Sequence, residues 1–141
     1  MTATIPPPRT VENSACTAEV YDQGAQVTRW APTGAEPVLY VSSQLRLAPG
    51  RSIRAGVPVC WPWFGPGRGP GVEPAHGFAR TSTWHLSGRD DGPGDTTLTY
   101  RLTSDDATSP HWPYRNTAEV SADGSAAAIA VAGPACAWAS R

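Results

Sequence analysis

Residues 96–103 read TTLTYRLT, and this stretch indicates the fold class more clearly than any other. Its apolar residues alternate with threonine and arginine, which is the period of two expected of a half-buried β-strand. Shorter runs of the same kind stand before and after it, separated by turn residues. We expect further strands at residues 17–21, 25–30, 38–42, 56–61, 82–86, 114–120 and 125–131, with a hairpin turn at 122–124. Pro58 confines its strand to a sheet edge or an irregular segment.

The composition also favours an all-β chain. Of 141 residues, 15 are Pro and 14 are Gly, about a fifth of the chain against roughly 12% on average. Long helices are therefore not expected, and no window carries a helical period with capping residues. Short, recurring strands predict a β-sandwich. We expect residues 1–11 to be a disordered segment, residues 12–141 to form one domain, and the GPGRGPG stretch at 65–71 to be a mobile loop.

The charged residues and cysteines exclude several classes of function. The net charge is −1, and all eleven basic residues are Arg, so neither a Schiff-base lysine nor a P-loop lysine exists. No basic face is interleaved with aromatics, so we expect no nucleic-acid partner. The three cysteines form no CxxC pair, which favours a cytoplasmic protein without a metal site. The N-terminus lacks the apolar core of a signal peptide, and we expect no membrane segment.

Residues 53–65, IRAGVPVCWPWFG, join an isolated Arg54 to an apolar and aromatic run. Its prolines and glycines exclude a helix or a central strand. One interpretation is a core segment with a kink at a sheet edge. The other is an aromatic-walled pocket with Arg54 at its mouth. Aromatic rings suit the apolar faces of sugars, and a guanidinium suits a phosphate or a carboxylate.

A second candidate segment is HGFAR at residues 76–80. His76 can donate or accept a hydrogen bond, and Gly77 allows the backbone to approach a ligand closely. If the segment is extended, His76 and Arg80 share one face with Phe78 between them. The alternative is a surface histidine and arginine at the start of a strand. We take Arg54, His76 and Arg80 as the candidate substrate-binding residues.

These blocks, in this order, resemble the hexose-6-phosphate mutarotase branch of the aldose 1-epimerase superfamily, also called glucose-6-phosphate 1-epimerases. The resemblance covers about Glu12 to Arg115, and Ala55 stands where the family usually has a second Gly. It rests on GAQVTRW at 24–30, VLYVSSQ at 38–44, IRAGVPVCWPWFG at 53–65, and HGFAR at 76–80 followed by Trp84. It implies that residues 12–141 form the N-terminal portion of a galactose mutarotase-like β-sandwich, or supersandwich.

The resemblance also implies a substrate and a reaction. The family interconverts the α and β anomers of a hexose or hexose 6-phosphate by general acid–base ring opening and closure, without a cofactor or metal. It associates Arg54 and Arg80 with the substrate, notably its phosphate, and His76 with the sugar pocket. The family's principal catalytic His and Glu lie later in longer chains, so we assign no catalytic residue here. We expect His111 to lie in a turn, and His85 to be a surface or packing residue.

The tail SAAAIAVAGPACAWASR at residues 125–141 does not resemble the family's continuation. We interpret it as a truncated, frameshifted or wrongly bounded reading, which predicts an incomplete sandwich. The leading functional hypothesis is therefore a glucose-6-phosphate 1-epimerase crippled by truncation. The alternative is a non-catalytic carbohydrate-binding module or a gene remnant, and a third is a structural β-domain without a ligand. The sequence leaves the preferred hexose and the oligomeric state open.

Overall fold

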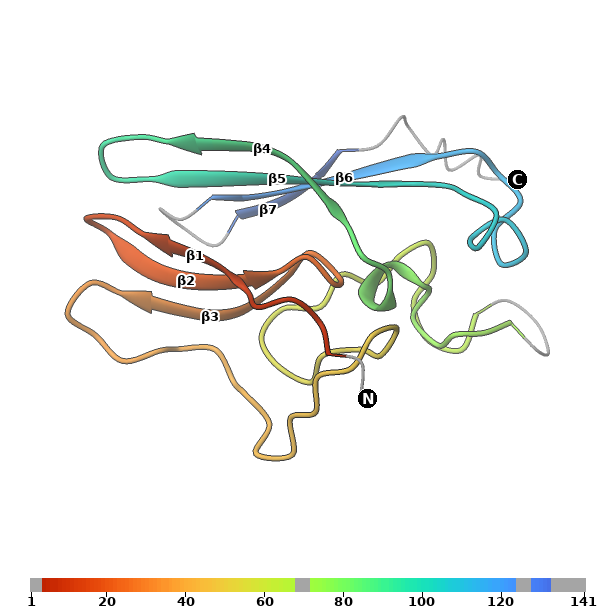
Figure 1. Ribbon diagram of the computed structural model, residues 1–141, viewed down its shortest axis with the longest axis horizontal. Coiled ribbons are helices and arrows are strands. Elements are labelled where there is room, and N and C mark those ends of the chain that lie inside the picture. The colour runs from red at the N-terminus through yellow and green to blue at the C-terminus, as the bar shows by residue number, and fades with distance from the viewer. Residues whose placement is uncertain (1–3, 68–71, 124–127, 133–141) are drawn as a thin grey trace.

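A computed structural model describes residues 4–67, 72–123 and 128–132, and over these ranges the chain forms two antiparallel β-sheets (Figure 1). The first sheet has the order β1-β2-β3 and the second the order β4-β5-β6-β7. The 3₁₀ helix η1 (Ala79–Thr81) precedes the second sheet. The strands are β1 (Arg9–Glu12), β2 (Cys16–Tyr21), β3 (Gln26–Pro32), β4 (His85–Asp91), β5 (Thr96–Thr103), β6 (Thr117–Asp123) and β7 (Ala128–Ala132).

The two sheets stack face to face and bury one shared hydrophobic core, which confirms the predicted all-β sandwich (Figure 1). On β5, Leu98 and Tyr100 are each 1% exposed, as the alternating pattern of that strand requires. They pack in one cluster with Val11 of β1 and Val20 of β2. Burying such a side chain contributes about 1.5–3 kcal/mol. The core lies between the sheets, and the long loops that carry the candidate residues add Val59, Phe78 and Ala79 to it.

Asp22, which follows β2, links both sheets at one end of the sandwich. Its carboxylate accepts hydrogen bonds from Nε and Nη2 of Arg9 at 2.8 and 2.9 Å and from the Tyr100 hydroxyl at 3.2 Å. Its backbone carbonyl accepts the Trp84 N–H at 2.8 Å. Burial, and next the charge of Asp22, raises the pKa of Tyr100 well above its usual range. These contacts tie β1 and the approach to β4 to the central strand β5.

Most predicted strands are confirmed with small shifts of their ends. The strand at 96–103 has the predicted bounds, and those at 17–21 and 25–30 correspond to β2 and β3. The predicted hairpin is formed by β6 and β7, but the turn predicted at 122–124 is misplaced. Ala122 and Asp123 belong to β6 and pair with Ile129 and Ala128, and residue 124 lies outside the described residues. The strand predicted at 82–86 begins later, at His85.

Two predicted strands and one predicted boundary are wrong. Residues 38–42 and 56–61 form only isolated bridges, Val41 with Ala55 and Val57 with Val27. Neither segment lies beside a strand along which its pairing could continue, and Pro58 has no N–H to donate. The segment expected to be disordered, 1–11, overlaps the ordered strand β1 from Arg9 onward. Part of the predicted mobile loop, 68–71, lies outside the described residues, as does most of the alanine-rich tail. Within the described ranges, no helix is long and apolar enough to span a bilayer.

Candidate functional site

The stretch that we call the 24–27 turn comprises Gly24 and Ala25, which precede β3, and Gln26 and Val27, which begin it. It contacts both arginine-bearing segments. Gly24 donates its N–H to the Ser82 carbonyl at 2.8 Å. It also packs so closely on the Arg80 backbone that an added Cβ would lie 3.0 Å from the Arg80 carbonyl oxygen. At the other end of the turn, the Val27 carbonyl accepts the Val57 N–H at 2.9 Å. The chain around Arg54 and the chain around Arg80 are therefore held by one four-residue stretch.

Arg54 lies on a backbone that is fixed along both edges. Ile53 and Ala55 are 4% and 6% exposed, whereas Arg54 between them is exposed. The side-chain amide of Gln26 donates to the carbonyls of Ile53, at 2.9 Å, and Ala55. The Ser42 N–H donates to the Arg54 carbonyl from the opposite edge at 3.1 Å. Among the described residues, the Arg54 guanidinium has no hydrogen-bond or ion-pair partner, so it is available to a solute anion.

The HGFAR segment is not extended, so the condition under which His76 and Arg80 would share one face is not met. His76 and Gly77 have φ values of 66° and 72°, and η1 follows at once. The cause is a close approach between two loops. A Cβ on Gly77 would overlap the carbonyl of Trp61, and the Ala79 N–H donates to that same carbonyl at 3.1 Å. The segment therefore coils against residue 61 instead of continuing as a strand.

His76 is fixed by the loop that follows the aromatic run. Its Nδ1 accepts the Gly65 N–H at 3.1 Å, and its ring meets the Phe64 ring edge-on with centroids 4.7 Å apart. The backbone N–H of His76 donates to the Gly65 carbonyl at 2.7 Å. Because Nδ1 is an acceptor, the neutral ring carries its proton on Nε2. His76 can therefore offer one N–H donor to a ligand.

Arg80 folds back toward His76. Its Nη2 donates to the carbonyl of Ala75, the residue before His76, at 2.8 Å. Its Nε is buried and has no partner among the described residues. A buried donor without a partner costs about 1–3 kcal/mol, and such a group calls for a structural or functional explanation. Arg80 is thus bonded to the backbone next to His76, whereas the 24–27 turn relates Arg54 to the backbone of Arg80 and not to its side chain.

The aromatic rings of the 53–65 run pack against the hydrophobic core, as the core-segment interpretation expects. We call this cluster the aromatic wall, and it extends further along the chain than the sequence indicated. Phe78 is 5% exposed, and the rings of Trp61 and Trp63 meet it edge-on with centroids 5.6 and 6.1 Å away. Trp63 also contacts Trp112 at 6.5 Å, and Trp112 contacts Tyr114 at 5.0 Å. Sequence reasoning missed the last two residues. Their aromatic and proline-rich context, HWPY at 111–114, resembles that of the CWPWF run and could have signalled them.

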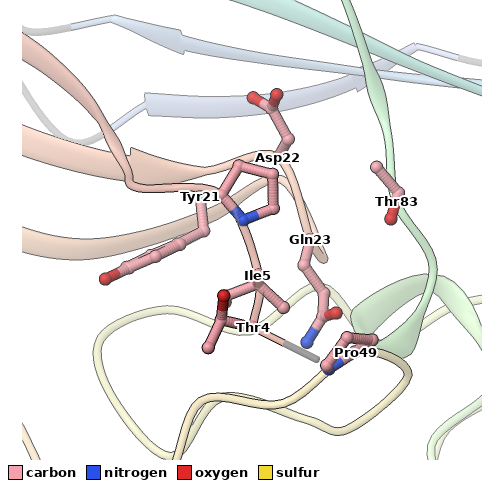
Figure 2. A pocket seen from close by; sticks show the side chains of 8 residues that line it. Thr4, Ile5, Tyr21, Asp22, Gln23, Pro49 and Thr83 are labelled. Carbon is pink, nitrogen blue, oxygen red and sulfur yellow. The ribbon is translucent and has the colours of Figure 1, made fainter. Parts of the chain in front are cut away.

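A small hollow of about 90 Å³ lies beside the end of β2 (Figure 2). None of the three candidate residues lines it. Its walls are Thr4, Ile5, Pro6, Tyr21, Asp22, Gln23, Pro49 and Thr83. Pockets that enclose small ligands usually measure about 300–1,000 Å³, so this hollow is too small for a hexose phosphate.

Two buried glutamines organise the loops around the site, and the sequence analysis did not single them out. Gln23 is 4% exposed; its amide donates to the carbonyls of Ala48 and Arg51 at 3.0 and 2.5 Å and accepts the Gly50 N–H at 3.1 Å. Gln26, at 0% exposed, donates to the carbonyls of Ile53 and Ala55 and accepts no hydrogen bond from the described residues. The available signal was a polar residue at an inward position of β3, where an apolar one is usual.

The two stacked antiparallel sheets are those of a galactose mutarotase-like protein. A crystal structure of a provisionally named mutarotase from Salmonella typhimurium matches with a TM-score of 0.75 and 38% identity, over 79% of this chain and 38% of that chain. The aldose 1-epimerase family model matches residues 9–123, and the chain belongs to that family. The resemblance drawn from the motifs is thereby confirmed.

Two curated relatives are similar over 92 residues each. A protein of Escherichia coli is 45% identical and one of Salmonella typhimurium is 42% identical, and both are provisionally named glucose-6-phosphate 1-epimerases. The match covers 65% of this chain and 31% of each relative. The chain thus spans about a third of the length of the curated relatives it matches.

Proposed function

We propose that this chain acts as a glucose-6-phosphate 1-epimerase, and that Arg54 and Arg80 bind the phosphate of the hexose 6-phosphate while His76 contacts the sugar. The observation that carries the proposal is the 24–27 turn, which bonds to the backbone on both sides of Arg54 and packs on the backbone of Arg80. One four-residue stretch at the start of β3 thereby supports both guanidinium-bearing segments.

Phosphate chemistry suits these two arginines. A guanidinium pairs with phosphate through two parallel N–H donors, and such charge-assisted bonds are roughly twice as strong as neutral ones. Arg54 is exposed and has no internal partner among the described residues. Arg80 has one neutral carbonyl partner and a buried Nε without any. Exchange of the Ala75 carbonyl for a phosphate would therefore be favourable for Arg80.

The sugar would lie against the aromatic wall. The apolar C–H face of a pyranose packs on aromatic rings, and Phe64 and Tyr114 remain 80% and 64% exposed. The Nε2–H of His76, whose Nδ1 is engaged by Gly65, would donate to a sugar hydroxyl or to the ring oxygen. This hydrogen bond would orient the ring relative to the phosphate.

Anomer exchange needs one base and one acid. The base removes the proton from the anomeric hydroxyl, the acid protonates the ring oxygen, and the C1–C2 bond rotates in the open aldehyde before the ring closes. His76 could accept a proton at Nδ1 only by losing its bond to Gly65. We therefore give His76 an orienting role and assign no catalytic base to the described residues.

The alternative is a non-catalytic module that binds a sugar phosphate. The occupied Nδ1 of His76 favours it, because the described site then binds and orients without transferring protons. Both functions require the same arginines, so they are distinguished by turnover and not by binding.

Exchange NMR on purified chain and pure α-glucose 6-phosphate separates the two. An epimerase accelerates anomer exchange over buffer, whereas a module binds the sugar phosphate and leaves the rate unchanged. Loss of a charged hydrogen-bonded partner costs about 1.5–3 kcal/mol, so Arg54→Ala or Arg80→Ala should each weaken binding roughly 10- to 100-fold. The exposed Arg46 on the neighbouring loop provides the matched control, Arg46→Ala. Binding that is unchanged in both site variants contradicts the phosphate role.

A further inference from the structure

Gln26 holds the backbone on either side of Arg54 with a single amide group. The residue is fully buried, and its two N–H donors are directed at the carbonyls of Ile53 and Ala55. The two carbonyls belong to the buried residues on either side of Arg54, whose side chain is exposed. Since Ser42 bonds the Arg54 carbonyl from the other edge, the Cα of Arg54 is fixed from both sides.

The orientation of this amide is determined by its partners. Rotating the amide by half a turn would place Oε1 against two carbonyl oxygens, so Nε2 must face Ile53 and Ala55. In this orientation Oε1 is buried and has no partner among the described residues. A buried acceptor without a partner is destabilising. Packing alone would be served as well by an apolar side chain of similar length, so the two carbonyls explain the amide.

We propose that Gln26 is a positioning residue that acts through Arg54 to set the affinity for the phosphate of a hexose 6-phosphate. This inference rests on the proposed function, because it requires Arg54 to bind the phosphate. A guanidinium on a fixed backbone loses less conformational freedom on binding than one on a mobile loop. Without the amide, residues 53–55 keep their bonds to residues 40–42 and lose those to β3.

Gln23 provides a matched control within the same chain. It is also buried, and its amide also donates to two backbone carbonyls, those of Ala48 and Arg51. These carbonyls do not flank Arg54. Gln23→Met and Gln26→Met therefore each remove a buried amide that donates to two carbonyls, and only the second releases the carbonyls on either side of Arg54.

The test is a titration of the purified full chain and its variants with glucose 6-phosphate. Gln26→Met should weaken binding about fivefold or more, whereas Gln23→Met should change it by less than about twofold. In an Arg54→Ala background, Gln26→Met should cause no additional loss, because residues that act through one another are not additive. Equal effects of the two glutamine variants, or full additivity with Arg54→Ala, would overturn the inference.

A second measurement uses the unaltered chain and does not depend on a variant that folds. Saturation with inorganic phosphate should shift the side-chain NH₂ resonances of Gln26 and leave those of Gln23 in place. Unmoved Gln26 resonances at saturation would overturn the inference. The two failures are distinguishable: if Arg54→Ala weakens binding and Gln26→Met does not, only the role of Gln26 is wrong. If Arg54→Ala has no effect, the phosphate role of Arg54 and the role of Gln26 are both wrong.

Discussion

The close approach of Gly56 to β3 supports one prediction in quantitative terms. Gly56 has φ +58°, and a Cβ there would overlap the Val27 carbonyl oxygen and lie 2.8 Å from the Thr28 Cα. In Gly56→Ala, the left-handed backbone costs about 1–2 kcal/mol. Forcing an extra methyl into a packed contact costs about 1–3 kcal/mol more. The free energy of unfolding should therefore fall by roughly 2–5 kcal/mol.

Gly34 separates the two contributions. It has φ +76°, but a Cβ there would meet nothing within 4 Å. Gly34→Ala should therefore cost only the backbone contribution, about 1–2 kcal/mol. Urea unfolding followed by tryptophan fluorescence measures both variants. Equal losses in the two would refute the reasoning that residues 53–56 are packed directly on β3.

Three other predictions concern the core and its links. The pKa of Tyr100 is raised in the folded chain, so the unfolded chain loses its tyrosine proton first. Stability should therefore be retained below about pH 10 and fall above it. Tyr100→Phe should reduce this fall in alkaline circular-dichroism melts, at a cost of about 1 kcal/mol, and an equal fall in this variant would contradict the prediction. Leu98→Ala should lower the free energy of unfolding by about 2–5 kcal/mol in urea titrations, because its side chain is 1% exposed; a loss below 1 kcal/mol would contradict the shared core. Trp84→Phe removes the 2.8 Å hydrogen bond from the indole N–H to the Ala79 carbonyl in η1. The loss should lower the free energy of unfolding by roughly 1–3 kcal/mol. Calorimetry should show a lower Tm, and an unchanged Tm would contradict the prediction.

The strands that were predictable from sequence are those whose alternation corresponds to a buried face. The strand at 96–103 is found with the expected bounds because Leu98 and Tyr100 both point into the core. Residues 38–42, VLYVS, are rich in residues that favour strands, yet Val38 and Tyr40 are 63% and 77% exposed. A strand needs a neighbouring strand as well as a pattern, and the neighbour is supplied by tertiary structure.

The same distinction holds for the site. Arg54, His76 and Arg80 stood out because of their context in the sequence. The left-handed backbone at His76 did not, because it results from the approach of Gly77 to Trp61, which is a contact between distant loops. Gln26 bonds to Ile53 and Ala55, which lie 27 and 29 positions further along the chain, so these bonds are also long-range. Local patterns identify candidate groups, and their positions depend on contacts that no local pattern contains.

A crystal structure of the chain with bound glucose 6-phosphate tests the central claim most directly. We predict phosphate oxygens at about 2.7–2.9 Å from guanidinium nitrogens of both Arg54 and Arg80. A phosphate bound by only one of these arginines, or held elsewhere on the molecule, would contradict the claim.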